Sequence, residues 1–419
     1  MERQLRDLMI AEAGDPPHRV TVEAVRRRAI RRRAAQAGAA GLAVILAAGL
    51  GAAVSAGVIH VGTSPGGSTG QHAGPPRYYV SEYYDPKAQG LVMAVRARAS
   101  GRVTATIGDP LRGAACGQGN VGVTAADDQT FFMTCISSRW GPGKFGPHSK
   151  LLWVESRIYR FQLTGSGRVS GYSLVKGGAL KGMMVENIAA TADGSEIAAE
   201  VLKPPPSGTI ATNLVPAGVV VINTRTGATA LWHTGPYVPG AVQYAYARDL
   251  SFTRDGRDLV VLEPRCPRGR YLAYCNGHAE MQVRAYSPAG RGGSLEGGRV
   301  LLQDATLRPR GTSLSDAFIS PDGTSLTTAL VGCPRHGACT LTVARIPVGT
   351  GGGERVLYQA RSGSRNAGIF FRFFSADASR RYLILDAGAG SKRVNGWIDH
   401  GRLVPLAPAN GNYPEYETW

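Results

Sequence analysis

Six cysteines are the residues of this 419-residue chain whose type and spacing most readily support chemistry. Their even number favours a disulfide framework, which forms and persists in an oxidising compartment. A metal site is the competing interpretation, but no C-x-x-C pattern occurs and the eight histidines are scattered. Pairing neighbours along the chain is the simplest of the 15 possible connectivities. The predicted bridges are Cys116–Cys135, Cys266–Cys275 and Cys333–Cys339.

One match to a catalytic motif occurs near the N-terminus. The segment Gly62-Thr63-Ser64-Pro65-Gly66 has the G-x-S-x-G pattern of a nucleophile elbow, which requires a strand before it and a helix after it. Here an apolar segment precedes the motif and a Gly/Ser/Pro-rich stretch follows it, so we interpret the match as accidental. The sequence also has no nucleotide-binding loop, haem motif or zinc-protease motif. We therefore predict no catalytic residue, no cofactor and no metal ligand.

A repeated pattern occupies most of the chain. An apolar strand, a polar turn with aspartate and a second apolar strand recur at 121–135, 187–201, 249–263, 316–330 and 371–385. Asp-Gly favours a tight hairpin, because glycine accepts positive φ and aspartate hydrogen-bonds its own backbone. The predicted turn residues are Asp128, Asp193, Gly194, Asp255, Gly256, Asp322, Gly323 and Asp377. A second hairpin follows each segment, so each unit has the four antiparallel strands of a propeller blade.

The number of units predicts the architecture. Residues 78–110 supply a further partial unit, which makes six blades, or seven if the region 201–217 contains additional strands. We expect N- and C-terminal strands to meet where the ring closes, because closure removes exposed sheet edges. The predicted fold class is therefore all-β, a six-bladed β-propeller preceded by one transmembrane helix.

One segment carries a family resemblance. Phe318-Ile319-Ser320-Pro321-Asp322-Gly323-Thr324-Ser325-Leu326 resembles the strand–turn–strand signature of TolB-like and WD40-like β-propellers, and residues 252–259 are similar. The resemblance covers roughly residues 78–408, although the Gly-His and Trp-Asp dipeptides of true WD40 repeats are missing. With its N-terminal segment, the chain resembles actinobacterial-type single-pass membrane proteins that carry such a domain outside the cytoplasm. The resemblance implies a fold only, since these propellers serve as enzymes, scaffolds and receptors.

Two of the predicted disulfide loops are basic. Cys266 and Cys333 each follow the second strand of a unit, so both loops should lie on the same face of the propeller. A rigid basic surface is a candidate binding rim. The alternative is that the bridges only hold long surface loops in an arginine-rich chain. The rim residues are Arg265, Arg268, Arg270, Arg335 and His336.

The N-terminal part predicts a membrane anchor. Residues 34–59 are apolar apart from Gln36 and Ser55, and a helix of this length crosses a hydrocarbon core of about 30 Å. Six arginines within residues 26–33 precede the apolar segment, so the positive-inside rule places the N-terminus in the cytoplasm. A cleaved signal peptide is the alternative, which the long basic stretch and the long apolar run disfavour. Both interpretations export the same domain.

The predicted organisation therefore has four parts and places the chain in the cell membrane as a single-pass protein. They are a cytoplasmic basic tail (1–33), a transmembrane helix (34–60), a flexible Gly/Ser/Pro linker (61–77) and an extracytoplasmic propeller (78–419).

Charge and composition limit the classes of partner that the chain can be expected to bind. The net charge is +17, but arginine far outnumbers lysine, which is typical of a GC-rich genome and is weak support for nucleic acid binding. We expect no nucleic acid partner. The expected function is a membrane-tethered module that binds a protein or envelope ligand, with signalling through the short tail as an option. The alternatives are a propeller-based extracytoplasmic hydrolase or lyase, and an anti-sigma-like membrane regulator.

Overall fold

The computed structural model describes most of the chain beyond residue 74. The chain divides into residues 1–69 and 70–419, and every described residue belongs to the second unit. The predicted tail, the transmembrane helix and all but the last three residues of the linker lie outside the described residues. No helix in the described part has the length and apolarity to span a bilayer. The described ranges are 75–85, 90–107, 122–140, 151–204, 215–233, 249–265, 280–289, 292–307, 312–333, 338–349, 353–362, 369–377, 382–389, 392–406 and 416–418.

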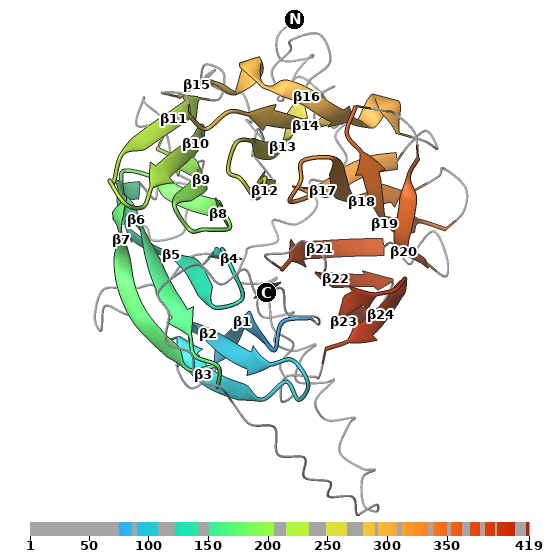
Figure 1. Ribbon diagram of the computed structural model, residues 1–419, viewed down its shortest axis with the longest axis horizontal. Helices are drawn as coiled ribbons and strands as arrows, with labels where there is room; N and C mark the ends of the chain where they lie inside the picture. Colours follow the sequence, from blue (N-terminus) through green and yellow to red (C-terminus); the bar gives the residue numbers. More distant parts are fainter. Residues whose placement is uncertain are drawn as a thin grey trace, which may run out of the picture. The chain divides into compact units, whose positions relative to one another are not determined.

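Six β-sheets stand around a common axis, as Figure 1 shows, so the prediction of a six-bladed propeller is confirmed. From the axis outwards, blade 1 consists of β25 (Tyr416–Thr418), β1 (Tyr78–Asp85), β2 (Gly90–Ala97) and β3 (Val103–Ile107). Blade 2 consists of β4 (Val123–Ala125), β5 (Thr130–Trp140), β6 (Leu151–Leu163) and β7 (Val169–Lys181). Blade 3 consists of β8 (Met184–Ala190), β9 (Glu196–Lys203), β10 (Val215–Asn223), β11 (Thr229–His233) and the short β15 (Gly293–Ser294).

The remaining three blades repeat the four-stranded order. Blade 4 consists of β12 (Asp249–Phe252), β13 (Leu259–Arg265), β14 (Glu280–Tyr286) and β16 (Arg299–Gln303). Blade 5 consists of β17 (Thr312–Ile319), β18 (Ser325–Gly332), β19 (Thr340–Pro347) and β20 (Arg355–Arg361). Blade 6 consists of β21 (Ile369–Ala376), β22 (Leu383–Ala389), β23 (Lys392–Asp399) and β24 (Arg402–Pro405). Two 3₁₀ turns, η3 (Leu295–Gly297) and η4 (Asp304–Thr306), flank β16.

The core lies between blades. In β10, Val220 and Ile222 pack toward blade 2, whereas Val219 and Val221 pack toward blade 4. Successive side chains of a strand point to opposite faces, and here each face is covered by a neighbouring sheet. The strands therefore read as nearly continuous apolar runs. A blade at the end of an open row would expose one apolar face to water. Closing the ring gives every blade a neighbour on both faces.

The two ends of the chain close the ring. β25 pairs antiparallel with β1, opposing Val80 to Thr418 and Glu82 to Tyr416, and so supplies the innermost strand of blade 1. The guanidinium of Arg98 in blade 1 lies 5.2 Å from the ring centroid of Trp397 in blade 6, a cation–π contact. The expected meeting of N- and C-terminal strands is present in this pairing.

A short strand from the chain segment of blade 4 pairs with the outer strand of blade 3. The segment that joins β14 to β16 reaches back, and its strand β15 pairs in parallel with β11, opposing Gly293 to Trp232. The hydroxyl of Tyr286 in blade 4 donates a hydrogen bond to the carbonyl oxygen of Leu295, which fixes this segment. The pairing covers the outer edge of blade 3 and ties it to its neighbour.

A glycine in β10 offers a test of the strand packing. Gly218 has φ +136°, and a Cβ there would overlap the carbonyl oxygen of Trp232 in β11. Gly182 also has positive φ, at +72°, but a Cβ there would meet open space. We expect Gly182→Ala to cost about 1–2 kcal/mol of backbone strain. Gly218→Ala should cost about 1–3 kcal/mol more through overpacking. Urea unfolding of both variants measures the difference, and equal losses would contradict the pairing of Gly218 with His233 between β10 and β11.

Candidate functional site

Antiparallel strand order divides the propeller into two faces. The turn face carries the turns between the first and second strands of blades 2 to 6 and between the third and fourth strands of each blade. The loop face carries the loops between the second and third strands and the connections between blades. The loop between β18 and β19 contains the Cys333–Cys339 disulfide, so it lies on the loop face.

The cysteines are placed in part. The predicted Cys333–Cys339 bridge is confirmed, and the Cys339 N–H donates to the hydroxyl of Ser362 at 2.9 Å, which links the bridged loop to the end of β20. Cys135 in β5 is also disulfide-bonded, while its expected partner Cys116 lies outside the described residues. The pair Cys266 and Cys275 lies outside them as well.

The predicted basic rim is mostly beyond the described residues. Arg268, Arg270, Arg335 and His336 all fall in undescribed parts of the two loops. Arg265 is the last residue of β13, where its backbone pairs with Glu280 of β14. The binding rim therefore stays a prediction. The described residues instead form a repeated hydrogen-bonded structure on the turn face.

On the turn face, three successive turns share one hydrogen-bonded geometry. The hydroxyls of Thr191, Thr253 and Ser320 donate to the aspartate two residues later, at 2.8, 2.8 and 2.5 Å. Each hydroxyl also accepts the backbone N–H five residues later, at 3.0, 3.1 and 2.9 Å. All three hydroxyl residues are buried. They were missed in the sequence, although a hydroxyl two residues before Asp-Gly is a readable signal. The aspartates are Asp193, Asp255 and Asp322, followed by Gly194, Gly256 and Gly323 with φ from +65° to +73°.

Two of the sequence-predicted turn aspartates occupy other positions than expected. Asp128 lies in the turn between β4 and β5, but the carboxylate that accepts the backbone N–H groups of Gln129 and Thr130 belongs to Asp127. This turn is one residue shorter, which shifts the aspartate. Asp377 begins its turn instead of occupying its centre. Its carboxylate accepts the N–H of Tyr382 at 2.7 Å, as the hydroxyl of Thr191 accepts that of Glu196.

The turns pack in series around the axis. A Cβ at Gly256 would lie 3.2 Å from the methyl group of Thr191, and one at Gly323 would lie 3.4 Å from that of Thr253. The N–H of Arg254 donates to the carbonyl oxygen of Pro321 at 2.9 Å. Each turn therefore fixes the position of the next one. In all three turns, the residue between the hydroxyl residue and the aspartate lines a common hollow.

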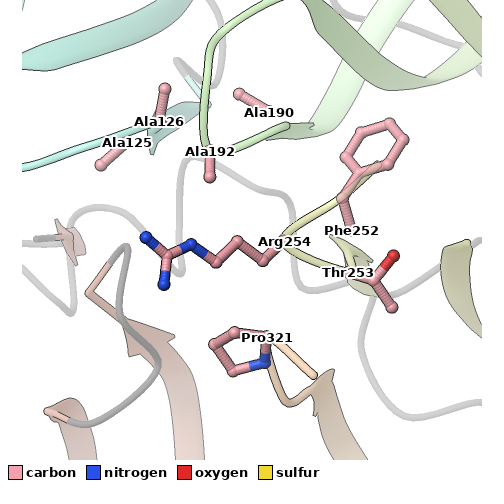
Figure 2. Close-up of a pocket in the computed structure, with 8 residues that line it drawn as sticks. All are labelled: Ala125, Ala126, Ala190, Ala192, Phe252, Thr253, Arg254 and Pro321. Carbon is pink, nitrogen blue, oxygen red and sulfur yellow. The ribbon is translucent and has the colours of Figure 1, made fainter. Parts of the chain in front are cut away.

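A hollow lies where these side chains meet, and we call it the axial hollow (Figure 2). It is shallow and partly open, with about 10 Å³ of enclosed space, room for about one water molecule. Blades 2 to 5 contribute residues to its lining. Blades 3, 4 and 5 each contribute the residue between the hydroxyl and the aspartate of their turn, which is Ala192, Arg254 and Pro321 respectively. Figure 2 shows the Arg254 side chain extending across the hollow between the alanines and Pro321. The lining residues are Ala125, Ala126, Ala190, Ala192, Phe252, Thr253, Arg254 and Pro321.

Arg254 differs from its arginine neighbours in charge pairing. Arg257 lies 3.3 Å from Asp255, Arg225 lies 3.9 Å from Asp193, and Arg299 lies 3.9 Å from Asp258. Arg254 is exposed and, among the residues that the structure describes, its guanidinium has neither an ion pair nor a hydrogen bond. None of the lining residues carries a negative charge. The hollow therefore presents one uncompensated positive charge beside small side chains, an arrangement that can bind an anion.

The described residues contain no group of three or more His, Cys, Asp or Glu side chains that could hold a metal ion. The chemistry available in the axial hollow is recognition by one guanidinium and by methyl and methylene contacts.

Comparisons with known proteins give distant structural likenesses only. No protein-family model matches the sequence, and no curated protein matches it significantly. Among solved structures, a prolyl endopeptidase is 14% identical with a TM-score of 0.36 over 67% of this chain, which spans about a third of the length of that enzyme. A protein from Lactobacillus plantarum is 12% identical, with a TM-score of 0.36, over 79% of this chain and 81% of its own. The β-propeller domain of the Trilobed protease from Pyrococcus furiosus is 11% identical, with a TM-score of 0.34, over 68% and 70%. At these identities and TM-scores the likenesses carry no argument about activity.

The turn carboxylates predict how stability depends on pH. Burial raises the pKa of Asp193, but hydrogen bonds from Ser195 and Thr191 outweigh it and leave that pKa below its usual value. Hydrogen bonds from the Arg257 N–H and the Thr253 hydroxyl lower the pKa of Asp255, and those from Ser320 and Thr324 lower that of Asp322. An aspartate in the unfolded chain has a pKa of 3.8, and a lower pKa in the folded chain means that the ionised carboxylate stabilises the fold. This stabilisation is fully present at pH values above 3.8 and is lost as the pH falls through the folded-state pKa.

We therefore expect the triple variant Asp193→Asn, Asp255→Asn, Asp322→Asn to be less stable than the parent at neutral pH. The difference in unfolding free energy should shrink below about pH 4. Urea unfolding from pH 7 to pH 3 measures it. A difference that stays constant over this range would show that the carboxylate charge contributes nothing to the turns.

Proposed function

We propose that this chain is a membrane-tethered, exported β-propeller that acts as a binding module for a protein or envelope ligand. The ligand would engage the turn face at the axial hollow. One observation carries the proposal: Arg254 extends over a hollow built by four blades, and in the described structure its charge is uncompensated. Arg254 is exposed and has no counter-ion among the described residues, so its guanidinium is accessible to an anionic group of a ligand.

Two features of the chain support export and tethering. Arginines at 26–28 and 31–33 precede the apolar segment 34–59, in the order that keeps the tail in the cytoplasm and carries the propeller across. The Cys333–Cys339 disulfide fits an oxidising compartment. In this arrangement the linker 61–77 gives the propeller freedom to reach a ligand near the membrane.

The alternatives receive less support. The peptidases among similar structures would favour a hydrolase, but they resemble this chain at TM-scores below 0.5. An anti-sigma-like role rests on the tail alone, and the tail lies outside the described residues. A binding role is supported by the position of Arg254 in the axial hollow.

Site-specific photocrosslinking in intact cells tests the proposal. A benzophenone amino acid at Ala192, which lines the axial hollow, should give a discrete adduct, and Arg254→Ala should reduce it at least several-fold. The matched control places the same amino acid at Leu174, an exposed apolar residue of the outer strand β7, and no adduct is expected there. The adduct should also react with a membrane-impermeant amine label added to the cells.

Three results would count against the proposal. They are an adduct at Leu174 equal to that at Ala192, an adduct at Ala192 that Arg254→Ala leaves unchanged, and an adduct that the impermeant label does not reach. The first two would remove the axial hollow as the binding site, and the third would place the propeller on the other side of the membrane.

A further inference from the structure

We infer that the axial hollow binds a carboxylate, namely the free C-terminal carboxylate of a peptide that ends in a small side chain. The inference rests on the proposed binding function and names the class of ligand. It follows from the charge of the hollow, from the hydrogen-bonding state of its walls and from its size.

Charge is the first step. The guanidinium of Arg254 is the single charged group in the lining, and no described carboxylate pairs with it. A guanidinium offers parallel N–H donors in a planar fork, which matches the two oxygens of a carboxylate. A carboxylate carries one negative charge and neutralises one arginine. A phosphate monoester carries about −1.5 to −2 at neutral pH, so a single arginine would leave part of its charge uncompensated.

The hydrogen-bonding state of the walls is the second step. The Thr253 hydroxyl already donates to Asp255, the Arg254 N–H to the Pro321 carbonyl and the Ala126 N–H to the Thr130 carbonyl. Pro321 has no N–H to offer. The side-chain donors left open toward the hollow are therefore those of Arg254. A ligand with several acceptors spread over its surface, such as a sugar, would leave most of them without partners.

Size and wall chemistry are the third step. Alanine side chains and the Pro321 ring lie around the Arg254 side chain, as Figure 2 shows, while polar atoms make up the larger part of the accessible lining. The space that these residues enclose is about 10 Å³, room for about one water molecule, whereas a drug-sized molecule needs about 300–1,000 Å³. The hollow thus accommodates an end group and not a whole ligand. A chain end with a small side chain places its carboxylate at Arg254 and its methyl group against the alanines.

The test titrates the purified full chain with N-trifluoroacetyl-Ala-Ala-Ala and follows the ligand by ¹⁹F NMR. We expect saturable line broadening for the free acid and at least ten-fold weaker binding for the C-terminal amide. Arg254→Ala should weaken binding of the acid at least ten-fold, and Arg254→Lys should weaken it less, because the ammonium keeps the charge but loses the fork. Arg257→Ala, in the same turn but paired with Asp255, is the matched control and should bind as the parent does.

Two further probes identify the source of the carboxylate. N-trifluoroacetyl-Ala-Asp-Ala-amide carries its carboxylate on a side chain and should bind more weakly than the free acid. Inorganic phosphate should compete no better than acetate at equal concentration. Stronger binding of the aspartyl peptide would overturn the terminal-carboxylate assignment, and stronger competition by phosphate would overturn the carboxylate assignment itself.

Equal binding of acid and amide, binding unaffected by Arg254→Ala, or no saturable binding at millimolar peptide would each overturn the inference. These failures are distinguishable from failure of the binding function. If the Arg254-dependent adduct at Ala192 forms in cells while the tripeptide does not bind, the module binds a ligand of another class.

Discussion

Ring closure is the constraint on which the rest of this structure depends. Each blade is a sheet with apolar residues on both faces, so it is stable only between two neighbours. The chain meets this requirement by giving its last described strand, β25, to the blade that begins with β1. Pairing of β25 with β1 and the contact of Arg98 with Trp397 hold blades 1 and 6 together. Once the ring is closed, the innermost strands are fixed around one axis, and their turns meet on the turn face.

The axial hollow follows from that arrangement. The buried hydroxyls of Thr191, Thr253 and Ser320 and the aspartates after them set the shape of three turns, and one residue of each turn lines the hollow. In blades 3 and 5 this position carries Ala192 and Pro321, and in blade 4 it carries Arg254. In these three blades the repeated turn thus supplies a common frame with one variable position. Function can change at that position without a change in the frame, which is how propellers carry many functions on one fold.

Much of the fold was predictable from the sequence because its signals are local and repeated. Asp-Gly turns such as Asp255-Gly256 and the apolar strands around them recur at nearly constant spacing, which led to six blades. The shift from Asp128 to Asp127 was missed because a turn one residue shorter looks the same in sequence. The place of Asp377 was missed because a carboxylate there takes the role that a hydroxyl has at the start of the other turns. Arg254 was not recognised as a site residue, since its role depends on four blades meeting in space. The cysteine spacing instead led to a predicted binding rim, which remains a prediction. Its residues are Arg265, Arg268, Arg270, Arg335 and His336.

Observation of the Arg254 side chain itself tests the central claim most directly. In a chain labelled with ¹⁵N-arginine, each Nε–H group gives its own NMR signal, and Arg254→Lys assigns the one that belongs to Arg254. If the axial hollow is an open carboxylate site, that signal shifts saturably on addition of a peptide with a free C-terminus, while the signals of the paired Arg225 and Arg257 stay in place. A signal of Arg254 that does not move, or that moves only as much as those of its paired neighbours, would contradict the account.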